Sequence, residues 1–193
     1  MSRRAGRPLK PRIDQVAPRG WLSIRVELVE GRGENYWPRP GRLIAAAPIH
    51  SFAQLATTID SAFARWDISH IHQFELSDDT KIGRPDPDSD DEVVDERRER
   101  LSRLQLGQQF VYVFDFGDYW AHLCTVGDKE VDPRGVLGLV PNVPMAYFGW
   151  GNIPDQYGRA WEGEGGESAL PSDPELTDLP PLQPGWGPRP HDD

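Results

Sequence analysis

The chain has 193 residues, of which 37% are hydrophobic, and it contains 19 prolines and 19 glycines. That length is enough for one domain with a core, whereas the composition is poor for a fully folded chain, so we expect unfolded segments. The only cysteine, Cys124, excludes an intrachain disulfide and a cysteine-based zinc cage, and it is typical of a reducing compartment. No apolar stretch follows the basic residues at the start, so we expect no secretory leader, and no apolar run approaches about 18 residues. We therefore expect a cytoplasmic protein without a membrane partner.

The formal net charge of −10 is unevenly distributed along the chain. Residues 1–20 hold six basic side chains and one acidic side chain, whereas residues 162–193 hold eight acidic side chains, one basic side chain and seven prolines. We interpret residues 1–20 as a disordered basic arm and residues 162–193 as a disordered acidic, proline-rich tail. Because an acidic body does not suit a phosphate backbone, only the basic arm leaves nucleic-acid binding open as an alternative.

The ordered part is expected to begin at WLSIRVELVEG, where apolar and polar residues alternate from Leu22 to Leu28 as in a half-buried strand. A turn-rich connection leads to a second strand candidate, RLIAAAP, which stops at Pro48. A helix is expected next, because Ser51 and Gln54 form an S-x-x-Q capping box. Five apolar residues at helical spacing form one face of this helix: Phe52, Leu55, Ala56, Ile59 and Phe63.

Beyond the helix, HIHQFEL predicts a strand with His70, His72, Phe74 and Leu76 on one face. Residues 78–100 are rich in proline and aspartate, and we interpret them as a mobile acidic insertion whose last part forms a short helix. The order of elements predicts an α+β domain over residues 21–161, in which one main helix covers a mostly antiparallel sheet. A β-grasp-like arrangement would accommodate this order.

The segments QQFVYVFDF and YWAHLCTV are expected to pair around a two-residue turn at Gly117-Asp118, because glycine accepts the positive φ of a type II′ turn. This register directs three aromatic side chains into the core: Phe114, Phe116 and Tyr119. It places four other side chains on the opposite face: Asp115, Trp120, His122 and Cys124. Asp115 and His122 are then diagonal neighbours that can contact each other.

Asp115-Phe116-Gly117 shares its letters with the magnesium-binding motif of protein kinases, but the chain has neither the glycine-rich phosphate loop nor the H-R-D catalytic loop that a kinase needs. The candidate site is instead a polar cleft formed by six residues of the predicted strands and turn: His70, His72, Asp115, Asp118, Trp120 and His122. Three interpretations stay open for it: hydrogen-bonded side chains with a structural role, a site for a divalent metal, and a catalytic dyad without metal. Cys124, on the same face, adds a candidate nucleophile.

A second dense motif, AYFGWGNIPDQYGRAW at residues 146–161, is rich in aromatic residues and glycines. We interpret Trp150, Tyr157 and Trp161 as packing anchors of a loop that wraps the sheet edge. The alternative is an aromatic binding surface. That surface forms one cleft with the polar residues if the loop lies beside Asp115 and His122.

Two separated motifs, ARWDISHIHQFEL and FVYVFDFGDYWAH, resemble the plasmid pRiA4b ORF-3-like family, which includes the passenger protein of an insertion element. The matching positions are Trp66, Ser69, His70, Phe74, Asp115, Phe116, Gly117, Asp118, Trp120 and His122. The resemblance covers roughly residues 21–161 and implies an α+β fold and an association with mobile elements, without an established activity. Many members have a P-P-E-D-type segment where this chain has PNVPMAYFGWGNIPDQYGRAW, so a role tied to that segment is not transferred.

Because no complete catalytic set is present, we expect a non-enzymatic binding or accessory module whose partner is a protein or a peptide. A small metal-dependent enzyme that uses the histidines and aspartates is one alternative, and nucleic-acid binding by the basic arm is another. The sequence leaves the ligand and the oligomeric state open.

Overall fold

The computed structural model describes residues 20–89 and 91–158. The predicted basic arm apart from Gly20, the predicted acidic tail and Trp161 lie outside these residues. The described elements follow in this order: β1 (Trp21–Gly31), β2 (Glu34–Asn35), β3 (Gly41–Ala46), α1 (Phe52–Ala62), β4 (His72–Leu76), β5 (Lys81–Gly83), β6 (Val93–Asp95), a 3₁₀ turn (Leu101–Arg103), β7 (Gln109–Phe114), β8 (Trp120–Val131), α2 (Pro133–Leu137) and β9 (Met145–Trp150). Within this part of the chain, neither helix has the length and apolar character needed to cross a membrane.

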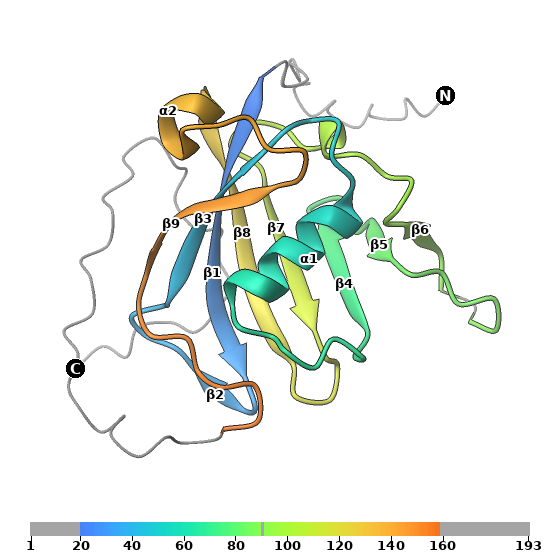
Figure 1. The fold of residues 1–193 in the computed structure, drawn as a ribbon. Helices are drawn as coiled ribbons and strands as arrows, with labels where there is room; N and C mark the ends of the chain where they lie inside the picture. Colours follow the sequence, from blue (N-terminus) through green and yellow to red (C-terminus); the bar gives the residue numbers. More distant parts are fainter. Residues whose placement is uncertain (1–19, 90, 159–193) are drawn as a thin grey trace, which may run out of the picture.

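The strands form one mixed sheet in the order β6-β5-β4-β7-β8-β1-β3-β9, with β2 paired to β1 beside this path. Neighbouring strands are antiparallel except for β5 and β6, which are parallel. Helix α1 lies across one face of the sheet, and β9 curls toward the same side (Figure 1). A mostly antiparallel sheet with two helices, one of them short, confirms the predicted α+β class.

Strand β1 and helix α1 supply the centre of the core, as their periodicity predicts. Leu22, Ile24, Val26 and Leu28 are fully buried, and so are the five residues of the apolar face of α1. The capping box is also present: the Ser51 hydroxyl accepts from the Gln54 amide at 3.2 Å, and Gln54 Oε1 accepts from the Ser51 amide at 2.9 Å. Local sequence signals therefore place α1 correctly, and its buried face docks it on the sheet.

The β7–β8 hairpin has a different register from the predicted one. Phe114 pairs with Trp120 and Tyr112 pairs with His122, so the connection is a five-residue turn, 115–119, and not the two-residue turn at 117–118. A slip of one residue moves every side chain of a strand to the other face. Three residues predicted to face away from the core are therefore buried in it: Trp120, His122 and Cys124. Phe116 and Tyr119, predicted to face inward, are 51% and 46% exposed.

Asp115 supports this longer turn through its backbone and its side chain, and its carbonyl accepts from the Tyr119 amide at 2.6 Å. Its Oδ1 atom accepts from the amides of Gly117 at 2.9 Å and Asp118 at 3.3 Å, as in an Asx turn. Asp115 and Tyr119 adopt positive φ values of 57° and 52°, so the chain reverses without a glycine at either position. Sequence rules for hairpins favour glycine at positive φ, and they therefore miss a turn that is closed by a carboxylate.

The acidic segment 78–100, predicted as a mobile insertion, contributes β5 and β6 to the edge of the sheet. The helix predicted for its last part is absent from the described residues, and β6 and the 3₁₀ turn stand there instead. The segment is also bonded to the start of α1, because the carbonyls of Glu96 and Glu99 accept from the amides of Ala53 and Phe52. These carbonyls satisfy amide groups that a helix start leaves without intrahelical partners.

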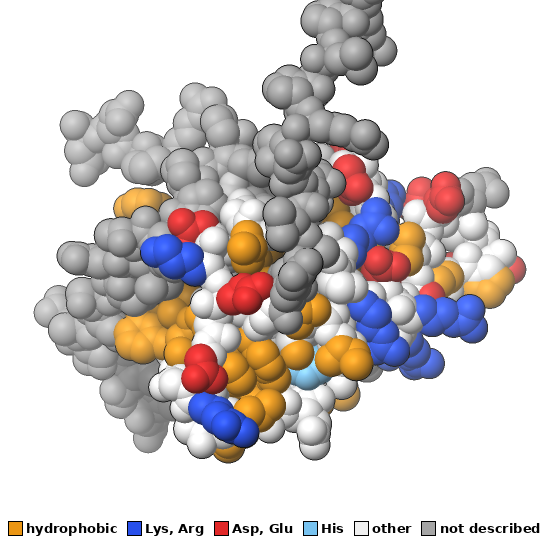
Figure 2. All heavy atoms as spheres, turned by 90° about the horizontal axis from the view of Figure 1, so that it is seen from above, with side chains coloured by type: hydrophobic (Ala, Val, Ile, Leu, Met, Phe, Trp, Pro, Cys, Tyr) orange, Lys and Arg blue, Asp and Glu red, His pale blue; other side chains and the backbone are white. Residues whose placement is uncertain are grey.

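Exposed apolar side chains gather at the upper end of the sheet, over α2 and the segment that leads to β9. Figure 2 looks down on this end and shows hydrophobic side chains mostly at the centre and left of the view. Charged side chains are most frequent at the right, on the side of β5 and β6. Residues 135–154 contain no charged side chain. We call the exposed apolar side chains of this stretch the α2 surface, and its members are Val136, Leu139, Val140, Val143 and Met145.

At its C-terminus, α1 ends in a Schellman motif. The Arg65 amide donates to the Asp60 carbonyl at 2.8 Å, and the Ala64 amide donates to the Ser61 carbonyl at 3.2 Å. Ala64 lies in the left-handed region with φ of 54°. This turn directs Arg65 into the interior, where its guanidinium lies 3.8 Å from the centre of the Trp120 ring, and starts the loop 66–71 at the lower end of the sheet.

Glycine at position 64 is expected to stabilise the fold. Ala64 is exposed, and the left-handed conformation costs a residue with a Cβ atom roughly 1–2 kcal/mol. After the larger entropy of the unfolded glycine is subtracted, Ala64→Gly is expected to raise the free energy of unfolding by about 0.5–1 kcal/mol. Urea denaturation measures this change. The control Ala53→Gly, inside α1, is expected to lower the same free energy by about 1 kcal/mol, and a loss of stability in both variants contradicts the Schellman assignment.

Candidate functional site

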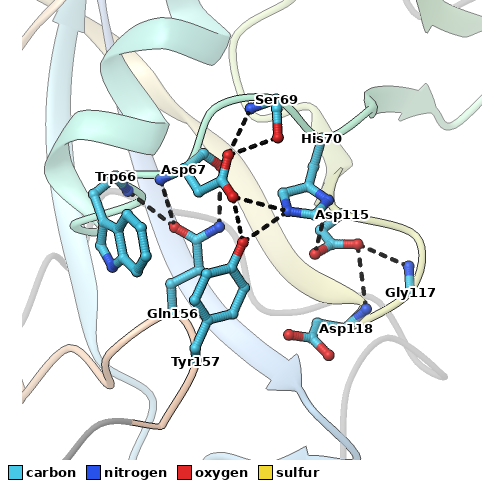
Figure 3. Close-up of polar contacts among 9 residues, drawn as sticks. All are labelled: Trp66, Asp67, Ser69, His70, Asp115, Gly117, Asp118, Gln156 and Tyr157. Atoms are coloured by element: carbon cyan, nitrogen blue, oxygen red, sulfur yellow. Dashed lines mark hydrogen bonds and ion pairs between the residues drawn. The ribbon is translucent and has the colours of Figure 1, made fainter.

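Three segments meet at the lower end of the sheet: the loop 66–71 after α1, the turn 115–119 between β7 and β8, and residues 153–158 after β9 (Figures 1 and 3). Their polar side chains form a set that we call the His70 network, which consists of Asp67, Ser69, His70, Asp115, Gln156 and Tyr157. The hydrogen bonds between the first and the last of these segments join residues that are 87 and 90 positions apart in sequence.

The His70 ring lies at the centre of the network. Its Nδ1 atom is 3.2 Å from Asp115 Oδ2, and its Nε2 atom is 2.9 Å from the Tyr157 hydroxyl and 3.7 Å from Asp67 Oδ2. Both ring nitrogens of His70 thus face an oxygen atom, one in the turn after β7 and the other in the segment after β9. The His70 side chain is 31% exposed, so the ring bridges the three segments at the surface.

Gln156 joins the segment after β9 to the loop after α1. Its Oε1 atom accepts from the amides of Trp66 at 2.9 Å and Asp67 at 3.0 Å, and its Nε2 atom donates to the Asp67 carbonyl at 3.0 Å. Gln156 is fully buried, and all three bonds go to backbone groups. The side chain thereby replaces the backbone partners that this irregular loop lacks.

The Asp67 carboxylate fixes the Tyr157 hydroxyl. Hydrogen bonds from Ser69 and from Tyr157 lower the pKa of Asp67 to about 2. The same bond to Asp67, 2.6 Å long, raises the pKa of Tyr157 to about 12. Tyr157 therefore keeps its proton at neutral pH, which makes its oxygen a poor nucleophile and a stable structural contact.

Asp118 differs from the other two carboxylates at this end. Its backbone is held on both sides, since its amide donates to Asp115 Oδ1 at 3.3 Å and its carbonyl accepts from the Arg32 amide at 2.6 Å. Its carboxylate has no hydrogen bond or ion pair within residues 20–89 and 91–158, and it stands apart from the dashed contacts in Figure 3.

The structure does not bring the six residues of the predicted cleft together. His70, Asp115 and Asp118 lie at the lower end of the sheet, whereas His72 donates to the buried Glu96 carboxylate at 2.6 Å. His122 and Trp120 are fully buried in the core, so Asp115 and His122 do not form the predicted pair. The described residues contain no group of three or more His, Cys, Asp or Glu side chains placed to hold a metal ion.

The buried members are also poor candidates for catalysis. Burial lowers the pKa of His122 to about 3, so the ring is neutral, and its Nδ1–H donates to the Tyr112 carbonyl at 3.3 Å. Burial raises the pKa of the Cys124 thiol well above its usual range, which disfavours the reactive thiolate. The Phe63 ring packs edge-on against His122, with the ring centres 4.6 Å apart.

The aromatic motif 146–161 divides between two roles. Trp150 is 5% exposed, donates from Nε1 to the Arg39 carbonyl at 2.8 Å, and lies under the Arg25 guanidinium at 4.6 Å. These contacts make it part of the packing between β1, β3 and β9. Tyr157 reaches the His70 network instead. A groove of about 330 Å³ runs along β9, lined by Arg42 and residues 146–151, and it is separate from that network.

The three segments that carry the His70 network also expose large apolar side chains, which sequence reasoning did not find as a group, and the Tyr157 ring belongs to both sets. We call the apolar set the loop surface, and its members are Trp66, Ile68, Ile71, Phe116, Tyr119 and Tyr157, with exposed fractions between 36% and 73%. The Asp115 amide donates to the Ile71 carbonyl, and the Trp66 and Tyr157 rings meet edge-on at 5.0 Å, so neighbouring segments of the surface touch. Asp67-Ile68-Ser69, an Asx-type turn signal, is the sequence feature that marks the loop.

Comparison with known proteins gives a family and a fold. A family model described as "Plasmid pRiA4b ORF-3-like protein" matches residues 24–149. No curated protein matches the chain. A crystal structure of a protein of unknown function from Methanosarcina mazei Go1 is similar with a TM-score of 0.54 and 19% sequence identity, and the match covers 70% of this chain and 72% of that one.

Acidification is expected to destabilise the fold through His122. Its pKa is 6.5 in the unfolded chain and about 3 in the fold, so the unfolded state binds the additional proton between these values. Its contribution is complete above pH 6.5 and is lost as the pH falls toward 3, by up to about 5 kcal/mol. His122→Phe is expected to flatten the dependence of the free energy of unfolding on pH, measured by urea denaturation from pH 7 to pH 4.

Asp60 provides the control, because its effect has the opposite sign. Burial raises the pKa of Asp60, which accepts from the Tyr112 hydroxyl at 2.7 Å, to about 6. Its contribution is therefore complete below the unfolded pKa of 3.8 and lost as the pH rises through 6. Asp60→Asn is expected to steepen the loss of stability on acidification. An unchanged slope in His122→Phe contradicts the neutral, buried ring.

Proposed function

The chain belongs to the family of plasmid pRiA4b ORF-3-like proteins, and we propose that it acts as a non-enzymatic binding module whose loop surface contacts a protein or peptide partner. The observation that carries this proposal is the exposure of six large apolar side chains on three adjoining segments. Contiguous apolar patches with a polar rim are typical of interaction sites. Tryptophan and tyrosine supply much of the binding free energy in many protein interfaces, and the loop surface contains both, as Trp66 and Tyr119.

The His70 network supports the proposal because it holds the loop surface in place. Gln156 and Tyr157 attach residues 153–158 to the loop 66–71, and Asp115 attaches the turn 115–119 to His70 and to the Ile71 carbonyl. A surface fixed before binding loses less conformational entropy when a partner docks. In this proposal the polar residues orient the apolar ones, and the apolar ones contact the partner.

The state of the titratable groups favours binding over catalysis. The Tyr157 hydroxyl is committed to Asp67, and Cys124 and His122 are buried. A nucleophile needs an accessible atom and a neighbouring base that takes its proton, which these three groups do not provide. An accessory role beside a mobile element fits the same proposal and rests on the family resemblance alone.

Selection from a phage-displayed library of random peptides tests the binding role. Full-length protein is expected to enrich peptides whose affinity falls at least tenfold in the double variant Phe116→Ala/Ile68→Ala, because both side chains lie in the loop surface. The matched control, Leu139→Ala/Val140→Ala, removes similarly exposed side chains from the α2 surface and is expected to leave the affinity unchanged. Failure to enrich any peptide, or equal losses in both double variants, overturns the proposal.

A further inference from the structure

We infer that the loop surface recognises a basic side chain, lysine or arginine, of its partner, and that the Asp118 carboxylate receives it. This inference rests on the proposed binding function and names the chemistry of the partner. It follows from the contrast between the three carboxylates at this end of the sheet.

Two of these carboxylates have their oxygen atoms committed to partners within the chain. Asp67 accepts from Ser69 and Tyr157, and Asp115 accepts from two turn amides and faces His70. The carboxylate of Asp118 has no such contact in the described part of the chain, although its backbone is bonded on both sides. Asp118 therefore presents, from a backbone that is held in place, a carboxylate whose capacity to accept hydrogen bonds is unused.

The surroundings of Asp118 suit a cation that also has an apolar stem. Phe116 and Tyr119, which belong to the same turn as Asp118, have rings that are about half exposed and contact no other ring among the described residues. The pKa of Tyr157 is raised first by its hydrogen bond to Asp67 and by burial, and then by the charges of three carboxylates: Asp67, Asp115 and Asp118. The Tyr157 ring therefore lies within electrostatic range of Asp118. Aromatic faces attract ammonium and guanidinium groups, and they also pack against the methylene groups that carry them.

A basic group within the chain does not occupy this position in the described residues. Arg32 is adjacent through its backbone, but its guanidinium lies beside Gly158 and forms no ion pair with Asp118. The net charge of −10 adds a field that attracts basic segments and disfavours acidic ones. Charge complementarity therefore selects a basic peptide segment as the occupant.

A charge swap tests the inference with the same peptide library. Peptides enriched on the wild-type protein are expected to share a lysine or arginine beside apolar residues, and replacement of that residue by alanine is expected to weaken binding about tenfold. Asp118→Asn is expected to cause a similar loss and to reduce the dependence of affinity on salt. Asp118→Lys is expected to enrich acidic peptides instead. The control Asp128→Lys changes the charge equally at an exposed position on β8 and is expected to keep the basic consensus.

The outcomes separate this inference from the binding role. Peptides that depend on Phe116 but share no basic residue, or that keep their consensus in Asp118→Lys, overturn the inference and leave the binding role intact. The absence of any enriched peptide overturns both. Circular dichroism and the denaturation midpoint of Asp118→Asn and Asp118→Lys establish that a lost interaction does not reflect a lost fold.

Discussion

The Asp115 carboxylate is the interaction on which the lower half of this domain depends. One oxygen closes the turn between β7 and β8, and the other faces His70 in the loop after α1. The backbone amide of the same residue donates to Ile71. A single residue thus sets the register of the central hairpin and connects it to the segment that leaves the helix. Together with the backbone bond from the Tyr119 amide to the Asp115 carbonyl, this side chain supports a five-residue turn that has two non-glycine residues at positive φ.

The register chosen by Asp115 also separates core from surface. It directs Trp120, His122 and Cys124 inward against α1 and leaves Phe116 and Tyr119 outside. The motif that carries the family resemblance is therefore divided by function: its second half is mostly packing, and its turn is the exposed part. At the surface, the polar residues bond to one another across three segments, and large apolar residues of the same segments are exposed. This division separates His70 and Asp115 at the surface from His122 in the core, and the described residues contain no group of three or more side chains placed to hold a metal ion.

Local periodicity predicted the elements that it alone determines. The strand at β1 and the capping box with its apolar face in α1 follow from neighbouring residues, and both elements are present. The half-buried pattern predicted for β1 is wrong, because Ser23 and Glu27 are buried as well. The hairpin register was missed because it depends on a side chain bonding to backbone two and three residues away, which alternation does not record. The strands β5 and β6 were missed because the acidic, proline-rich composition of their segment predicted disorder. The opposing signal was weak, since β6 is a three-residue strand with only two apolar residues, Val93 and Val94. Gln156 was unpredictable because its partners lie about 90 residues earlier.

The backbone conformation of Tyr119 has a consequence for protein engineering. A bulky residue at φ of 52° is energetically inferior to glycine, and its ring is about half exposed, so it adds little to the core. A procedure that optimises folding stability position by position would therefore replace this tyrosine, and would treat exposed Phe116 and Ile68 in the same way. The resulting protein would be more robust and smoother at its lower end, and it would have lost the features that distinguish that end from an ordinary loop. The residues that contribute least to folding stability at this end are therefore the same residues that give its surface a distinct chemistry.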